Sequence, residues 1–119
     1  MSYEDFWKLS EKFVERVNSM PEAIEEMEEY DTVLQFSPTD SDKGAYLIFK
    51  NQKCELHEGE HPNPVVSYFA DLETFIRILN GDVDPTKLYF AGELKIKGKL
   101  ADALRFRAIA DIVIPKKEE

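Results

Sequence analysis

The side chains best suited to chemistry fall in one short segment, Cys54-x-x-His57-x-x-x-His61, which holds the cysteine and both histidines of the chain. Thiolate and imidazole are common zinc ligands, and a cysteine beside a histidine can act as a nucleophile. Residues 52–58, however, alternate in polarity as a strand does, which turns Cys54 and His57 to opposite faces. We therefore expect no metal site and no catalytic pair here, but a buried cysteine beside two loop histidines.

The sequence shows no other catalytic or cofactor motif. Gly92 and Gly98 frame an expected strand and belong to no Gly-x-Gly-x-x-Gly or Walker pattern, so nothing indicates a nucleotide site. The acidic pairs between residues 25 and 29 fit the solvated face of a helix better than a catalytic carboxylate pair. The sequence thus predicts no cofactor and no enzymatic activity.

Composition narrows the class of protein further. The 119 residues include 24 acidic and 15 basic side chains, with a net charge of −9 and 43% hydrophobic residues. This length favours a single domain over residues 1–119. A nucleic-acid partner is not expected, because phosphate contacts need clustered lysine and arginine. The sequence shows neither a signal-peptide pattern nor the roughly 20 apolar residues of a membrane span, so we expect a cytoplasmic protein.

Hydrophobic periodicity predicts the elements that must position any site. A helix is expected over residues 3–18 and a second short helix or a kink after Pro21. Four strands follow, then a helix capped by Asp71, a helical turn from Asp84-Pro85, a fifth strand with Leu94 and Ile96 inward, and a last helix. The first four strands are expected at residues 32–37, 45–51, 52–58 and 65–70. The helix that follows them is expected at residues 71–80, the fifth strand at 93–97 and the last helix at 99–110. This order predicts an α+β fold, in which the helices pack on one face of a five-stranded sheet.

The C-terminal third holds more apolar surface than one sheet face can bury. The helix over residues 71–80, the turn at residues 88–90 and the last helix all require burial. These elements either pack into a dry core or close around a cavity for an apolar ligand. Composition alone leaves both alternatives open.

The segment 66–109 resembles the sterol carrier protein type-2 domain. Three features carry the resemblance together: a helix that ends in Leu79-Asn80-Gly81 before Asp84-Pro85, an apolar turn leading into Gly92-Glu93-Leu94-Lys95-Ile96-Lys97-Gly98, and a following helix over residues 100–109. The resemblance implies a sheet whose helices enclose an apolar tunnel, and a non-enzymatic function in lipid binding or transfer. The ligand would be a fatty acid, a fatty acyl-CoA or another lipid.

We expect the apolar residues of this segment to contact the ligand. The residues are Phe75, Ile76, Leu79, Leu88, Phe90, Leu94, Ile96, Leu104, Phe106 and Ile109. A transient membrane or enzyme partner also fits the surplus apolar surface. The alternative function is that of an accessory or assembly domain for an enzyme complex that acts on apolar substrates such as quinone precursors. The sequence does not indicate an oligomeric state.

The last helix is expected to act as a gate, because its apolar residues cover more of its circumference than one contact can bury. Lys95, Lys97, Lys99, Arg105 and Arg107 would bring positive charge near the entrance. The chain ends in Lys-Glu-Glu and not in a peroxisomal address of the Ser-Lys-Leu type, so we expect neither a peroxisomal location nor a sterol as the natural ligand.

Overall fold

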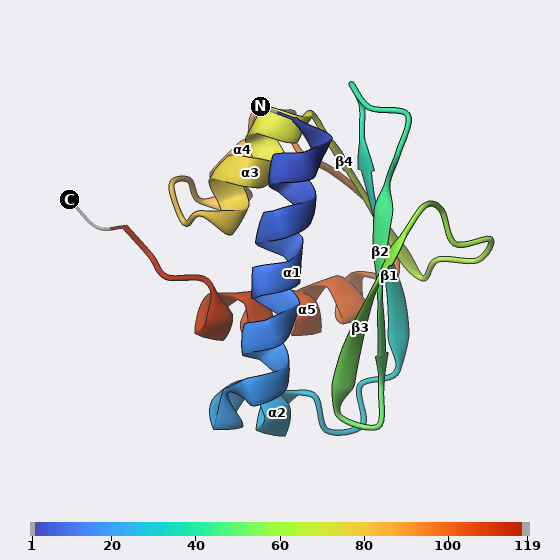
Figure 1. Cartoon of the computed structure of the whole chain (residues 1–119), viewed down its shortest axis with the longest axis vertical. Helices are drawn as coiled ribbons and strands as arrows, with labels where there is room; N and C mark the ends of the chain where they lie inside the picture. Colours follow the sequence, from blue (N-terminus) through green and yellow to red (C-terminus); the bar gives the residue numbers. More distant parts are fainter. Residues whose placement is uncertain (1, 118–119) are drawn as a thin grey trace.

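The computed structural model describes residues 2–117, and these form five helices and one five-stranded sheet. In chain order the elements are α1 (Tyr3–Ser19), α2 (Pro21–Glu26), β1 (Thr32–Pro38), β2 (Ala45–Lys50), β3 (Lys53–Glu58), β4 (Val66–Ala70), α3 (Leu72–Leu79), α4 (Pro85–Phe90), β5 (Lys95–Gly98) and α5 (Leu100–Val113). The α+β fold expected from the sequence is thus confirmed. Figure 1 shows α1 running alongside the sheet and α5 crossing behind α1.

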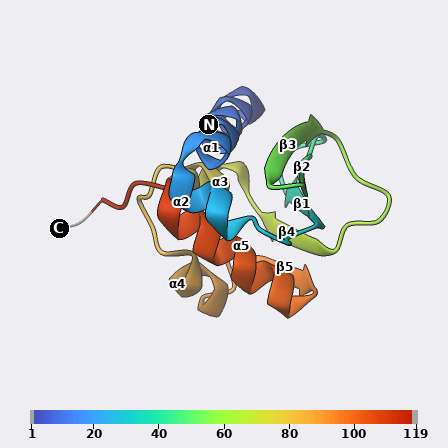
Figure 2. The ribbon, with the colours of Figure 1, turned by 90° about the horizontal axis from the view of Figure 1, so that it is seen from below.

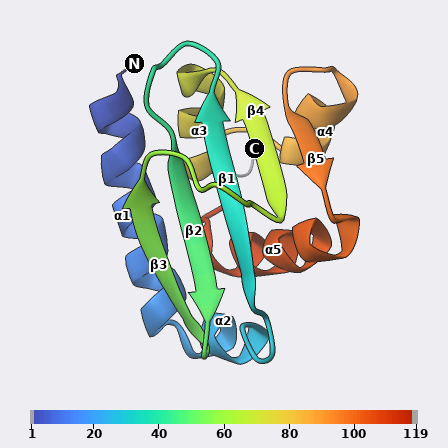
Figure 3. The same ribbon diagram turned by 90° about the vertical axis from the view of Figure 1, so that its right-hand side faces the viewer.

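The strands are ordered β3-β2-β1-β4-β5. Neighbouring pairs are antiparallel except β1 and β4, which pair in parallel. The parallel pair requires the chain to cross from the β3 edge over β2 and β1 before β4 begins. The connecting segment, residues 59–65, makes this crossing on the sheet face that carries no helix (Figure 3).

Gln35 holds this crossing segment in place. Its side chain lies under the segment and is only 3% exposed. Its amide nitrogen donates to the carbonyls of Ala45 and Gly59 at 3.2 and 3.0 Å, and its amide oxygen accepts from the backbone N–H of His61 at 2.8 Å. Because both polar atoms of this buried amide are hydrogen-bonded, the side chain ties the connecting segment to the sheet. The opposite face of the sheet is left free for the helices.

The helices cover one face of the sheet, which we call the inner face (Figures 2 and 3). Along β2 the alternation is clear, because Ala45, Leu47 and Phe49 are buried while Tyr46 and Ile48 on the other face are partly exposed. A strand turns successive side chains to opposite faces, so this pattern places the core between the sheet and the helices.

Local signals set the starts of the helices that frame the pocket described below. The carboxylate of Asp71 accepts from the backbone N–H of Thr74 at 2.8 Å and caps α3. Hydrogen bonding by the Thr74 side chain, and then by this backbone N–H, lowers the pKa of the Asp71 carboxyl. Asp84 caps α4 in the same way, and Pro85 occupies its first turn.

Two boundaries differ from the expectation by more than one residue. The fifth strand begins at Lys95 and not at residue 93, because the N–H groups of Glu93 and Leu94 donate to the carbonyl of Leu88 and close the end of α4. The last helix continues to Val113 and not only to residue 110, since Val113 is fully buried and extends the helix's packed side.

The segment after α5 packs against the turn that follows α3. Gly81 has a positive φ of 77°, and a side chain there would collide with the carbonyl of Pro115. The N–H of Lys117 donates to the Gly81 carbonyl at 3.3 Å, and its ammonium lies 3.0 Å from the Asp82 carboxylate. The last two residues of the tail, 118–119, lie outside the described residues. Among residues 2–117, no helix combines the length and the apolar composition that a membrane span requires.

Candidate functional site

The structure separates the side chains of the cysteine–histidine segment, as strand alternation predicts. Cys54 is buried on the inner face, where its backbone N–H and carbonyl bond the side chain of Asn18 at 2.9 Å each. His57 stacks on Tyr46 on the outer face, with ring centroids 5.1 Å apart. Within residues 2–117, no three histidine, cysteine, aspartate or glutamate side chains come together as metal ligands.

The Cys54 thiol is expected to resist alkylation in the native protein. Burial raises the pKa of this thiol well above its ordinary value, so almost no nucleophilic thiolate exists at pH 8. Mass spectrometry after one hour with iodoacetamide should show an unmodified native protein, and a fully modified protein in 6 M guanidinium chloride. Rapid labelling of the native protein would contradict this burial.

A pocket of about 860 Å³ lies between the inner face of the sheet and helices α1, α3, α4 and α5. Aromatic rings form its wall. Phe106 lies at their centre, with its ring centroid 5.8 Å from those of Phe13 and Phe36 and 5.9 Å from that of Tyr68. Phe36 stacks on Tyr68 at 4.9 Å, and Phe75 meets Phe36 at 6.0 Å. This wall offers an apolar ligand a large surface without charge.

Tyr68 adds one polar group to this wall. The residue is only 7% exposed, and its hydroxyl bonds no other group among residues 2–117. Burial raises the pKa of Tyr68 far above its usual value of about 10, so the hydroxyl remains a neutral donor at any physiological pH. A bound ligand with a polar atom could accept a hydrogen bond from it.

One face of α5 borders the pocket and changes character along its length. Leu100, Leu104, Arg107 and Asp111 follow each other at steps of four, three and four, which places them on one side of the helix. All four line the pocket. The two leucines are 69% and 63% exposed, so the first half of this helix face forms an apolar rim.

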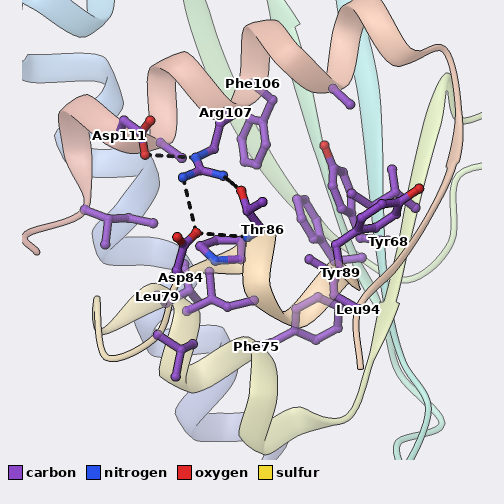
Figure 4. A pocket seen from close by; sticks show the side chains of 18 of the residues that line it. Tyr68, Phe75, Leu79, Asp84, Thr86, Tyr89, Leu94, Phe106, Arg107 and Asp111 are labelled. Carbon is purple, nitrogen blue, oxygen red and sulfur yellow. Dashed lines mark hydrogen bonds and ion pairs between the residues drawn. The ribbon is translucent and has the colours of Figure 1, made fainter. Parts of the chain in front are cut away.

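The second half of that face belongs to a polar cluster that joins α5 to α4 (Figure 4). The Arg107 guanidinium donates to the Thr86 hydroxyl at 2.6 Å and to the Asp111 carboxylate at 3.0 Å, and it lies 3.4 Å from the Asp84 carboxylate. Lys116 stands 3.9 Å from Asp111. The pocket therefore has an apolar end near the start of α5 and a charged end near its last turns.

A family model that describes the SCP-2 sterol transfer family matches residues 11–111. The chain belongs to this family. The match confirms the resemblance that the segment 66–109 indicates, and it extends that resemblance over most of the chain. No curated protein matches the chain.

Solved structures of SCP-2 proteins share the fold. Sterol carrier protein domain 2 of Helicoverpa armigera is 18% identical, with a TM-score of 0.78 over 97% of this chain and 92% of that one. Palmitated SCP2L2 of Aedes aegypti is 16% identical, with a TM-score of 0.71 over both whole chains. UbiJ-SCP2, a ubiquinone synthesis protein, is 17% identical, with a TM-score of 0.67 over 85% of this chain and 81% of that one.

The structure brings together most of the residues expected to contact a ligand in this SCP-2 protein. Those that line the pocket are Phe75, Leu79, Phe90, Leu94, Ile96, Leu104 and Phe106. The remaining three, Ile76, Leu88 and Ile109, are 4%, 8% and 0% exposed and are buried outside the lining. Ile109 lies on the packed side of α5, together with Val113.

Other parts of the site were not expected from the sequence. Phe6, Ser10 and Phe13 of α1 line the pocket, as do Phe36 of β1 and Ala45 and Leu47 of β2. The sequence shows that these residues lie on apolar faces, but it contains no signal that they reach the same cavity as α4. The sequence shows the spacing of the α5 residues that face the pocket. It does not show which residues of α4 they contact.

The expected basic entrance is only partly formed. Arg107 lines the pocket, but Arg105 turns away from it. The Arg105 guanidinium donates to the carbonyls of Glu26 and Glu28 at 2.7 and 3.0 Å and lies over the ring of Tyr30 at 4.9 Å. Arg105 therefore fastens α5 to the end of α2, which is a structural role that the sequence did not indicate.

Proposed function

We propose that this chain is a non-enzymatic lipid carrier that holds one long-chain fatty acid or fatty acyl group in the pocket between the sheet and the helices. The aromatic, largely uncharged pocket of about 860 Å³ carries the proposal, because small-molecule pockets commonly measure roughly 300–1,000 Å³ and are mostly apolar. Membership of the SCP-2 sterol transfer family supports it.

The charged end of the pocket supports an anionic head group. Lys87, Arg107, Lys116 and Lys117 line this region. Three of these cations are paired with aspartates, and Lys87 forms no ion pair within residues 2–117. A carboxylate that entered here would find donors already held in place, while its chain lay against the aromatic wall. The head group adds orientation, and the chain contributes most of the free energy of binding.

A chain-length series tests the carrier function. Delipidated protein is titrated with saturated fatty acids of eight, twelve and sixteen carbons, and with the sixteen-carbon alcohol as a control for the head group. Each buried methylene contributes about 0.8 kcal/mol, so affinity should rise roughly fourfold per carbon while the chain fits. At a hundredfold excess over Kd the melting temperature should rise by about 10 °C. An absent shift for every chain would refute the proposal.

An accessory role in an enzyme complex is the second candidate, and the likeness in fold to UbiJ-SCP2 favours it. In that role the pocket would hold an apolar substrate, such as a quinone precursor, beside a partner enzyme. The same titration with a long isoprenoid quinone separates the two functions. Tight binding of the quinone and weak binding of all fatty acids would support the accessory role.

A further inference from the structure

The Tyr68 hydroxyl is a hydrogen-bonding group that the fold itself does not use. Tyr68 is only 7% exposed, yet its hydroxyl makes no hydrogen bond within residues 2–117. In that part of the chain, Thr32 carries the one completely enclosed side-chain oxygen or nitrogen that lacks a partner. The Tyr68 hydroxyl is therefore not completely enclosed, and the space that it meets is the pocket, which Tyr68 lines. Since buried polar groups are nearly always paired, a free donor on a cavity wall indicates a partner that the cavity receives.

The other hydroxyls that line the pocket have partners. Ser10 donates to a backbone carbonyl of its own helix at 2.8 Å, and the Thr86 hydroxyl accepts from Arg107 at 2.6 Å. Tyr89 is 49% exposed, so water can bond its hydroxyl. Among the described residues that line the pocket, Tyr68 thus carries the single hydroxyl that is both buried and unpaired.

The Tyr68 hydroxyl lies away from the charged end of the pocket. Burial, and after it the negative charge of Asp102, raises the pKa of this hydroxyl, which places it toward the first turn of α5. Arg107 follows Asp102 by five residues, which is about 7.5 Å along a helix axis. Figure 4 shows Tyr68 on one side of Phe106 and the cluster around Arg107 on the other. A chain whose carboxylate meets this cluster passes Phe106 before it reaches Tyr68.

We propose that the preferred ligand is a long-chain fatty acid with a hydroxyl or keto oxygen near the middle of its chain, and that this oxygen accepts a hydrogen bond from Tyr68. The inference rests on the proposed carrier function and names the class of ligand. An unsubstituted chain that fills the pocket displaces water from the hydroxyl and leaves a buried donor unpaired, which lowers affinity. An oxygen on the chain replaces that water, so the pocket selects for it.

The variant Tyr68→Phe tests this bond, because it removes the hydroxyl and keeps the ring. Delipidated native and variant proteins are titrated with octadecanoic acid and with the same acid bearing a hydroxyl on carbon twelve. The native protein should bind the hydroxylated acid about tenfold more tightly, which is a ratio that one hydrogen bond to a buried group can supply. In Tyr68→Phe this preference should disappear or reverse, and the unsubstituted acid should bind at least as tightly as it binds the native protein.

Two controls accompany the titration. The acid with its hydroxyl on carbon two carries the oxygen beside the carboxylate, and Tyr68→Phe should not weaken its binding relative to that of the unsubstituted acid. Tyr46→Phe removes a tyrosine hydroxyl from the outer face of the sheet and should keep the native preference. The empty Tyr68→Phe protein should melt within about 2 °C of the native protein, since no bond within the protein is lost.

The outcomes separate this inference from the carrier function. Equal affinities of the native protein for the two acids, or a preference that persists in Tyr68→Phe, would overturn the role of Tyr68 and leave the carrier function intact. Equal weakening of both acids by Tyr68→Phe would place the carboxylate itself at Tyr68 and would overturn the inference in the same way. A preference that Tyr46→Phe also abolishes would overturn it too. Absence of binding for every fatty acid would refute the carrier function, and the inference with it.

Discussion

Replacement of Phe75 by aspartate is expected to lower the free energy of unfolding by at least about 4 kcal/mol and to abolish fatty acid uptake. Phe75 is 5% exposed, and its ring centroid lies 5.5 Å from that of Phe6 on α1 and 6.0 Å from that of Phe36 on β1. Truncation of a buried phenylalanine costs roughly 3–5 kcal/mol, and the unpaired carboxylate adds its desolvation. Urea denaturation followed by circular dichroism measures the stability.

A conservative change at the same position separates packing from charge. Phe75→Leu keeps an apolar side chain against the pocket and should cost only about 1 kcal/mol, with fatty acid affinity reduced by less than about tenfold. The Leu variant also provides a folded protein for the binding assay if the aspartate variant does not fold. Native stability together with native uptake in Phe75→Asp would show that the side chain lies outside both the core and the pocket.

Helix α4 is expected to open far more readily than α5 in the empty protein. Leu88 is the buried residue of α4, and beyond it the helix is held mainly by the bonds of Arg107 to Thr86 and Asp84. By contrast, α5 buries Ile109 completely, and its Asp102 carbonyl accepts from the Tyr30 hydroxyl at 2.6 Å. The amides of residues 86–90 should therefore exchange with deuterium at least 100-fold faster than those of residues 106–110.

A bound fatty acid should slow the exchange of α4 by tenfold or more and leave that of α5 nearly unchanged. The variant Arg107→Gln, which loses the charged bonds to α4, should accelerate exchange of α4 in the empty protein. The sequence suggested the last helix as the gate, and that hypothesis makes a different prediction. Exchange that is equally fast in both helices and equally slowed by the ligand would place the gate in α5.

Much of the fold could be predicted because its signals are local. Strand alternation around Cys54 and His57 assigns them to opposite faces, and Asp71 and Asp84 mark helix starts by side-chain caps that span three residues or fewer. The ends of helices and strands were harder to predict where a hydrogen bond to a neighbouring element intervenes. Leu94 alternates like a strand residue, but its N–H bonds Leu88, and the strand therefore begins one residue later.

The candidate site could be predicted only in part, since the sequence identifies apolar faces and not the space between them. Phe106 and Ile109 both appear as apolar residues on the same helix. The structure places Phe106 in the pocket wall and Ile109 in the core, because the direction in which α5 crosses the sheet selects which side of the helix is packed. The role of Arg105 at the end of α2 depends on the same packing.

The sequence by itself determined the element types, the faces of the strands and membership of the SCP-2 family, because periodicity, caps and turn motifs depend on residues a few positions apart. Only the tertiary structure decided that β1 and β4 pair in parallel, that the exposed apolar residues of α4 and α5 share one opening, and that Arg107 meets Thr86 and Asp84. Those last contacts join residues 21 and 23 positions apart. The packing of whole helices against the sheet brings these residues together. No local pattern in the chain predicts that packing.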